Sequence, residues 1–201
     1  MRLIGLFITL LSSNCFALDL ATLQQRLQAQ QNFSAQLTQT KTLKGWSKAL
    51  QAQGLLACTQ KNGVLYYLQK PLNASYWLQS TQINVREGNT AVRVLSTAQM
   101  PWLAGITSLL SASVSGDWQR LQQQFNIKLV KAEENDWQIE LTPIAEPLRQ
   151  TLQTVQVSGA AQITQIVISD KKGDRTQINL QHHQSLDDEQ MRALLQQAGQ
   201  G

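Results

Sequence analysis

The chain has 201 residues, of which 42% are hydrophobic and 15% are charged, a composition typical of a folded globular protein rather than a disordered one. Its formal net charge is +4 and falls to +3 without residues 1–17, which contain Arg2 and no acidic residue. Because lysines and arginines are spread along the chain and form no basic helix, the sequence does not indicate nucleic-acid binding.

Residues 1–17 have the three parts of a secretory signal peptide: Arg2, an apolar run at 3–11, and small or polar residues that end at Ala17. The apolar run is too short to remain as a membrane-spanning helix. We therefore expect cleavage after Ala17 and export of a mature chain, 18–201, that forms one domain.

The two cysteines bear on this prediction. A lipoprotein signal would make Cys15 the first mature residue, but the Ser-Ser-Asn at 12–14 lacks the small and aliphatic pattern that such a signal needs. Cleavage after Ala17 leaves only Cys58, so no internal disulfide is expected. A lone cysteine in a strand is more often a small buried hydrophobic residue than a reactive thiol.

The mature chain is predicted to begin with a short amphipathic helix and a strand. Leucines recur at helical spacing over 20–27, and Asp19 stands at the N-cap position. From residue 33 the apolar residues alternate with polar ones, as in a half-buried strand. The connection at 42–53 contains Trp46, for which two interpretations remain open: a lid over an apolar pocket, or packing on the sheet.

A β-hairpin is predicted next. Two apolar runs, 55–59 and 64–68, flank the turn-forming pair Asn62-Gly63. Both runs are apolar at nearly every position, so both faces of the hairpin should be covered. One face could meet the protein core and the other a hydrophobic ligand.

Further strands and two helices follow. Strands are expected at 76–78, 83–85 and 90–95 in an antiparallel meander, because no helix intervenes. Pro101 is predicted to start a helix with a broad apolar face, and Asp117 to cap a second helix at 118–124.

The last third of the chain again favours strands. They are predicted at 125–130, 137–143, 155–157, 163–168 and 176–180, with a brief helical turn at 148–152 and a hairpin loop at 170–173. Ser185, with Asp188 three residues later, is predicted to cap a final helix.

The sequence offers no catalytic constellation, and no cofactor is expected. It lacks the common nucleophile, nucleotide and metal-binding motifs. His182 and His183 are adjacent on a predicted strand and would point to opposite faces, so they cannot bind one ion together. The acidic residues at 187–189 are explained by the start of a helix. We predict that the protein is not an enzyme and binds no metal.

Five segments, taken in order along the chain, resemble the LolA family. They are Phe-Ser-Ala-Gln-Leu-Thr-Gln at 33–39, Gly-Val-Leu-Tyr-Tyr-Leu-Gln-Lys-Pro at 63–71, Ser-Gly-Asp-Trp at 115–118, Trp-Gln-Ile-Glu-Leu-Thr-Pro at 137–143, and the hairpin at 170–180. The resemblance covers essentially the whole mature chain. Within the family, the short strand at 54–60 and the Ser-Gly-Asp-Trp helix start resemble the branch of LolA-like proteins that is distinct from the housekeeping carrier.

The resemblance implies a mainly β fold: a curved, incomplete antiparallel β-barrel of about eleven strands, with a helical lid over an apolar cavity. It also implies a monomeric periplasmic carrier of acylated lipoproteins or other lipids, with a donor at the inner membrane and an acceptor at the outer membrane. In the housekeeping carrier an arginine before the strand-ending proline bonds to the lid. Lys70 matches that position but lacks the planar donor group of arginine, which puts the same latch in doubt.

Candidate lipid-binding residues are apolar side chains expected on the inner face of the strands and on the lid. They are Phe33, Leu37, Leu65, Tyr67, Trp77 and Trp137 on strands, and Trp46, Trp102 and Leu109 on lid elements. For each, ordinary core packing explains the residue as well as ligand contact does. Two alternatives to a carrier remain: a non-enzymatic accessory protein that senses a lipid or peptide, and a hydrolase or isomerase, which would need a polar cluster inside the cavity.

Overall fold

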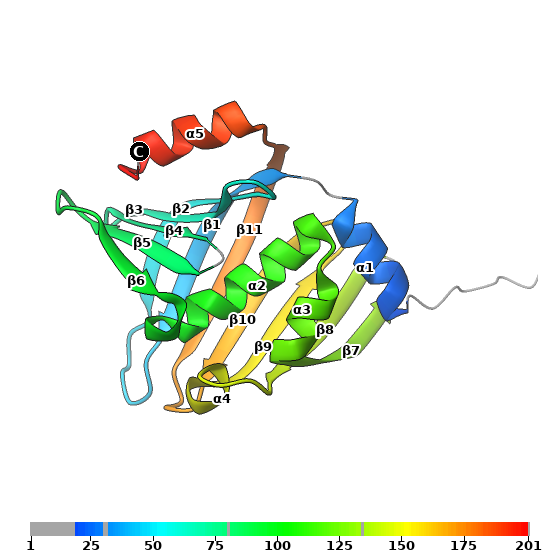
Figure 1. The fold of residues 1–201 in the computed structure, drawn as a ribbon. Helices are drawn as coiled ribbons and strands as arrows, with labels where there is room; N and C mark the ends of the chain where they lie inside the picture. Colours follow the sequence, from blue (N-terminus) through cyan, green and yellow to red (C-terminus); the bar gives the residue numbers. More distant parts are fainter. Residues whose placement is uncertain (1–18, 30–31, 80, 134, 201) are drawn as a thin grey trace, which may run out of the picture.

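The computed structural model describes residues 19–29, 32–79, 81–133 and 135–200 (Figure 1). The predicted signal peptide, with Cys15, lies outside the described residues. Within them, no helix is long and apolar enough to cross a membrane.

Eleven strands form one antiparallel sheet in the order β6-β5-β4-β3-β2-β1-β11-β10-β9-β8-β7. The strands are β1 Phe33–Thr42, β2 Leu50–Thr59, β3 Gly63–Lys70, β4 Ala74–Leu78, β5 Gln82–Glu87, β6 Arg93–Ser96, β7 Phe125–Glu133, β8 Asp136–Pro143, β9 Leu152–Gly159, β10 Ile163–Asp170 and β11 Arg175–Ser185. The sheet is strongly curved, and its end strands β6 and β7 do not pair with each other (Figure 1). The predicted curved, incomplete antiparallel barrel is confirmed.

Alternating side chains explain why the sheet has one dry, concave face. In β8, Trp137, Ile139 and Leu141 are fully buried while their neighbours along the strand are less covered. The pairing of β1 with β11 joins the first and last strands, and with them the two halves of the sheet, with Leu37 opposite Leu180.

The predicted hairpin is confirmed as β2 and β3, but its turn is longer than expected. Thr59 pairs with Gly63, so the loop is formed by residues 60–62. Gly63 has φ +78°, and a Cβ atom there would collide with the carbonyl oxygen of Leu78.

Most helices lie on the concave face. They are α1 Leu20–Gln28, α2 Pro101–Ser115, α3 Trp118–Gln124 and α4 Leu148–Thr151, with a 3₁₀ turn, η1 Thr97–Gln99, before α2. Figure 1 shows α2 running diagonally across the concave face with α1 and α3 beside its C-terminal half. Helix α2 ends at Gly116 with φ +77°, and Asp117 then caps α3 by accepting a hydrogen bond from the Arg120 amide.

Helix α5 (Asp188–Gln197) lies on the opposite, convex face, over β2 and β3 (Figure 1). Its Met191 and Leu195 pack against Ala57 and Leu65 of the hairpin. The helix is capped by Asp187, which accepts from the Gln190 amide, and not by Ser185 as predicted. The chain then ends against the sheet, where the Gln200 amide group donates to the Ser75 carbonyl oxygen.

Helix α5 corrects one prediction about the hairpin. Both faces of β2 and β3 are covered, as their apolar runs require. However, the face opposite the core is covered by the chain's own last helix and not by a ligand.

Candidate functional site

Helix α2 separates two hollows in the molecule. One, here called the apolar pocket, lies beneath the N-terminal end of α2 and reaches the sheet. The other, here called the polar groove, lies over the outer face of α2. The two hollows share no lining residue.

The apolar pocket has a volume of about 250 Å³. Its walls come from β1, β2, β3, β4, the β10–β11 hairpin and α2, and include Leu50, Ala52, Leu68, Tyr76, Trp102 and Ile168. Gln39, Lys41 and Asp174 add polar groups to this lining. The volume is slightly below the range of about 300–1,000 Å³ that is usual for small-molecule sites.

An aromatic contact holds the N-terminal end of α2 over the pocket. The Trp102 ring meets the Tyr66 ring edge to face, with their centroids 6.1 Å apart. The Tyr66 hydroxyl donates a 2.6 Å hydrogen bond to Gln39 Oε1, and burial raises the pKa of this phenol above its ordinary value. This arrangement fixes Tyr66 as the surface on which Trp102 rests.

Beyond the pocket, α2 itself fills the concave face. Its apolar side chains are almost completely buried against the sheet: Leu103, Ile106, Leu109 and Leu110. A long acyl chain could therefore reach the apolar wall of the sheet only if α2 moved away from it.

Cys58 marks the contact between α2 and the sheet. The thiol is fully buried and donates a 3.6 Å hydrogen bond to the carbonyl oxygen of Leu110 in α2. Burial raises its pKa to about 12. The prediction that Cys58 is a small buried residue is confirmed.

The buried thiol leads to a prediction about pH. The ordinary pKa of a cysteine in the unfolded chain is 9.0, so between that pH and about 12 the unfolded chain binds fewer protons than the folded one. The free energy of unfolding should therefore fall as pH rises through this range, by up to roughly 4 kcal/mol from this group. Urea unfolding at increasing pH measures the slope, which Cys58→Ala should flatten. An equal slope in both proteins would contradict the prediction.

The structure brings together five of the nine predicted lipid-binding residues. Phe33, Leu37, Leu109 and Trp137 are buried in the core of the concave face, and Trp102 packs against that core. The indole N–H of Trp137 donates a 2.6 Å hydrogen bond to the Ala160 carbonyl oxygen, which fixes the ring at one end of the sheet.

Three of the nine lie on the other side of the sheet. Leu65, Tyr67 and Trp77 pack in the cluster beneath α5, so their predicted place on the inner face is wrong. The side chains of β3 that point inward are Val64, Tyr66 and Leu68. Successive residues of a strand point to opposite faces. A prediction that points Tyr67 rather than Tyr66 inward therefore places Leu65, Tyr67 and Trp77 together on the wrong face of the sheet.

Trp46 and Lys70 lie at the end of the sheet near the apolar pocket. Trp46 is in the β1–β2 loop with 64% of its surface exposed, so it does not pack on the sheet. Lys70 is exposed at the end of β3. In the described part of the chain no hydrogen bond or ion pair joins Lys70 to α2, and its role as a latch stays a prediction.

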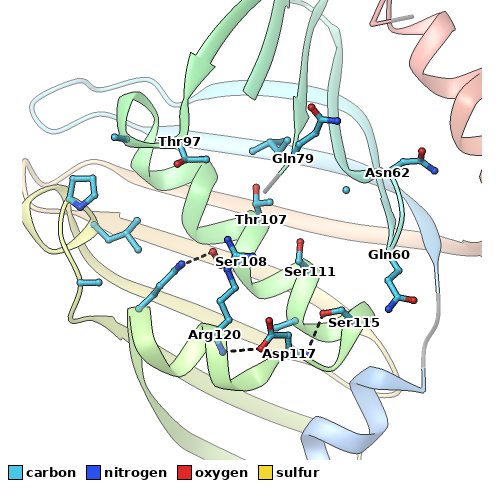
Figure 2. Close-up of a pocket in the computed structure, with 18 of the residues that line it drawn as sticks. Gln60, Asn62, Gln79, Thr97, Thr107, Ser108, Ser111, Ser115, Asp117 and Arg120 are labelled. Carbon is cyan, nitrogen blue, oxygen red and sulfur yellow. Dashed lines mark hydrogen bonds between the residues drawn. The ribbon is translucent and has the colours of Figure 1, made fainter. Parts of the chain in front are cut away.

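Figure 2 shows the polar groove, which has a volume of about 680 Å³. Its floor is the outer face of α2, with the hydroxyl groups of Thr107, Ser108 and Ser111. Asn62 and Gln79 come from turns between strands on one side, and residues of α3 and the loop before α4 form the other. The Ser108 hydroxyl donates to Gln124 Oε1 at 2.7 Å.

The two hollows offer different chemistry on opposite sides of one helix. The apolar pocket suits a hydrocarbon chain, while the polar groove presents hydroxyl and amide groups that suit a peptide or a headgroup. Within the described residues, no group of three or more His, Cys, Asp or Glu side chains is placed to hold a metal ion.

Comparison with known proteins identifies one family. A family model described as outer membrane lipoprotein carrier protein LolA-like matches residues 12–187. No curated protein matches the chain.

Three solved structures are similar at low identity. A LolA superfamily protein from Nitrosomonas europaea is 11% identical with a TM-score of 0.48, over 83% of this chain and 93% of that one. A putative outer membrane lipoprotein-sorting protein domain from Vibrio parahaemolyticus is 10% identical with a TM-score of 0.48, over 89% and 97%. A DUF1329 family protein from Desulfovibrio piger is 13% identical with a TM-score of 0.46, over 84% and 92%.

Proposed function

Because the chain belongs to the LolA-like outer membrane lipoprotein carrier family, we propose that it carries the acyl chains of a lipoprotein or another lipid across the periplasm. The cargo would pass from a donor at the inner membrane to an acceptor at the outer membrane. The observation that carries the proposal is the apolar pocket, which lies between the N-terminal end of α2 and the dry face of the sheet.

The energetics favour a covered route for such a cargo. Each methylene group kept out of water contributes about 0.8 kcal/mol, so a long acyl chain gains on the order of 10 kcal/mol from a dry binding site. The concave face of the sheet supplies that site from Phe33, Leu37 and Trp137, provided that α2, which carries Trp102 and Leu109, swings away from it. In the closed state, with α2 packed on the sheet, the contact between Trp102 and Tyr66 is the one nearest the pocket.

Helix α2 also accounts for release. Its apolar side chains occupy in the empty protein the space that acyl chains would occupy in the loaded one. Helix α2 and the cargo therefore compete for the same apolar face of the sheet. When the cargo leaves, α2 packs on the sheet again, and this contact offsets part of the free-energy cost of releasing the cargo.

A second function is favoured by the polar groove. With its hydroxyl and amide lining, the groove would accept a peptide segment, as an accessory or sensor protein requires. In the carrier it would instead hold the polypeptide part of an acylated cargo.

Mass spectrometry of the protein purified from a periplasm without detergent tests the proposal, under native conditions and after solvent extraction. We expect a bound acylated species. Ala52→Phe, which fills the apolar pocket, should abolish it, whereas Ala98→Phe, which narrows the polar groove, should retain it.

The opposite result would favour the second function. Protein that carries no lipid and takes up neither palmitate nor an acylated peptide contradicts the carrier role. A peptide bound without an acyl chain, and lost only in Ala98→Phe, would support the accessory role.

A further inference from the structure

Two large apolar side chains are exposed at the mouth of the apolar pocket, and a third is exposed in the adjoining β1–β2 loop. Leu50 and Leu72 line the pocket, yet 49% and 64% of their surfaces face solvent. Trp46 lies four residues before Leu50 in the β1–β2 loop and is 64% exposed. Exposed tryptophan and leucine gathered at one opening are unusual unless they meet another apolar phase.

The same end of the molecule is basic. Residues 20–86 contain seven lysines and arginines and no acidic residue. The fold places four of these lysines at the pocket end, where the β10–β11 loop and the first residue of β11 add three more basic residues. Together they form what we call the basic rim: Lys41, Lys44, Lys48, Lys70, Lys171, Lys172 and Arg175.

A direct contact joins the two loops that carry most of the rim. The backbone N–H of Lys44 donates a 3.0 Å hydrogen bond to Asp174 Oδ1, and the Lys44 side chain lies against Gly173. Lys41 pairs with Leu50 across β1 and β2, and both line the pocket, so a basic and an apolar side chain lie next to each other at the mouth.

The nearby carboxylates do not cancel this charge. Asp170 and Asp174 are the two acidic residues in the pocket lining, against seven basic residues of the rim. Both accept backbone hydrogen bonds: Asp170 from the Asp174 amide at 2.9 Å, and Asp174 from Lys44. Glu87, at the end of β5, is paired with Arg93, at the start of β6, at 3.1 Å; the loop between them adjoins Asn73 through the Gly88 amide.

Glu146, in the loop before α4, lines the polar groove and not the apolar pocket. It is paired with Arg149 of α4 at 2.8 Å, while the Lys171 amide donates to the Thr151 carbonyl oxygen at the end of α4. The rim therefore keeps a positive field around the apolar mouth.

We propose that the basic rim docks this protein on a bilayer that carries anionic phospholipid. Trp46, Leu50 and Leu72 enter the headgroup layer, the lysines contact lipid phosphates, and the apolar pocket faces the acyl chains. Tryptophan prefers the membrane interface, and each lysine near an anionic surface strengthens binding roughly fivefold. This inference rests on the proposed carrier function and extends it, because it names the surface of the protein at which lipid cargo would be exchanged with a membrane.

Sedimentation with vesicles tests the docking. We expect binding to vesicles of equal parts phosphatidylglycerol and phosphatidylcholine, weakened by added salt, and little binding to phosphatidylcholine alone. The double variant Lys44→Gln/Lys48→Gln should bind at least about tenfold more weakly. Trp46→Ser should also weaken binding, without the loss of charge.

The matched control removes two lysines away from the rim. Lys61 lies in the β2–β3 loop and Lys128 on the edge strand β7, and both are exposed. Lys61→Gln/Lys128→Gln has the same net charge as the rim variant and should keep full vesicle binding. Equal weakening in both double variants would overturn the rim as the docking surface.

Two further results would overturn the inference. One is the absence of vesicle binding, which would leave an acidic protein as the partner of the rim. The other is equal binding to phosphatidylcholine alone. Uptake of palmitate from solution, measured without vesicles, separates a failure of membrane docking from a failure of the carrier function. Palmitate uptake without vesicle binding refutes only the docking. Vesicle binding without palmitate uptake refutes only the carrier function.

Discussion

Replacing Leu109 with alanine is expected to speed acyl-chain uptake by at least about tenfold. Leu109 is fully buried where α2 packs on the sheet, so its truncation should cost about 2–5 kcal/mol. If this packing free energy is lost from the contact between α2 and the sheet, the equilibrium shifts toward molecules in which α2 is displaced, and their population rises at least about tenfold. Stopped-flow binding of a fluorescent fatty acid measures the rate.

The control for this variant lies on the other face of the sheet. Met191→Ala truncates an equally buried residue of α5, and it should lower the free energy of unfolding by a similar amount. Uptake should stay at the wild-type rate in this variant. Faster uptake in both variants would indicate general loosening of the fold, and unchanged uptake in both would show that α2 is not the lid.

Introducing a charge at Met191 is expected to detach α5 from the sheet. Met191→Asp places a carboxylate among Ala57, Leu65 and Leu195, where it has no partner, and should cost about 4 kcal/mol or more. Loss of the helix also uncovers Tyr67 and Trp77. We expect a large drop in the urea midpoint, stronger binding of an apolar dye, and self-association in gel filtration.

Ala193→Asp is the matched control on the same helix. Ala193 is exposed, so the same charge should reduce stability only by the difference in helix propensity, about 0.7 kcal/mol. Similar unfolding midpoints for the two variants would refute the assignment of α5 as the cover of the convex face.

Regular alternation made most of the sheet predictable. In β8 the apolar residues occupy every second position, so both the strand and its inward face follow from the sequence. Local turn chemistry limited the prediction elsewhere. The strand expected from residue 90 begins at Arg93, because the Thr90 amide and hydroxyl both bond to the Glu87 carbonyl oxygen and hold a turn.

The inward face of the hairpin could not be predicted. Residues 64–68 are all apolar, so a shift of one residue leaves the pattern unchanged while exchanging Tyr66 for Tyr67. The deciding facts are tertiary: α2 covers one face and α5 the other. Both helices have apolar faces, and nothing local assigns either one to a side of the sheet.

The pocket itself depends on residues that are far apart in the sequence. Gln39, Leu68, Trp102 and Ile168 meet because β1 pairs with β11 and α2 crosses the sheet. The apolar face of its helix predicts Trp102. Its partner Tyr66 does not follow from the sequence, because residues 64–68 are all apolar and do not determine which face of β3 points inward.

The unpaired end strands have a consequence for how much the protein can hold. In a closed barrel, the number of strands and their stagger fix the radius, so capacity is built into the sequence. Here β6 and β7 are the two free ends of the described sheet. Because no ladder joins β6 to β7, no hydrogen bond between these two strands fixes the radius of the sheet. For the proposed carrier, capacity would then depend on the curvature of the sheet, and one set of wall residues would serve cargoes with one, two or three chains.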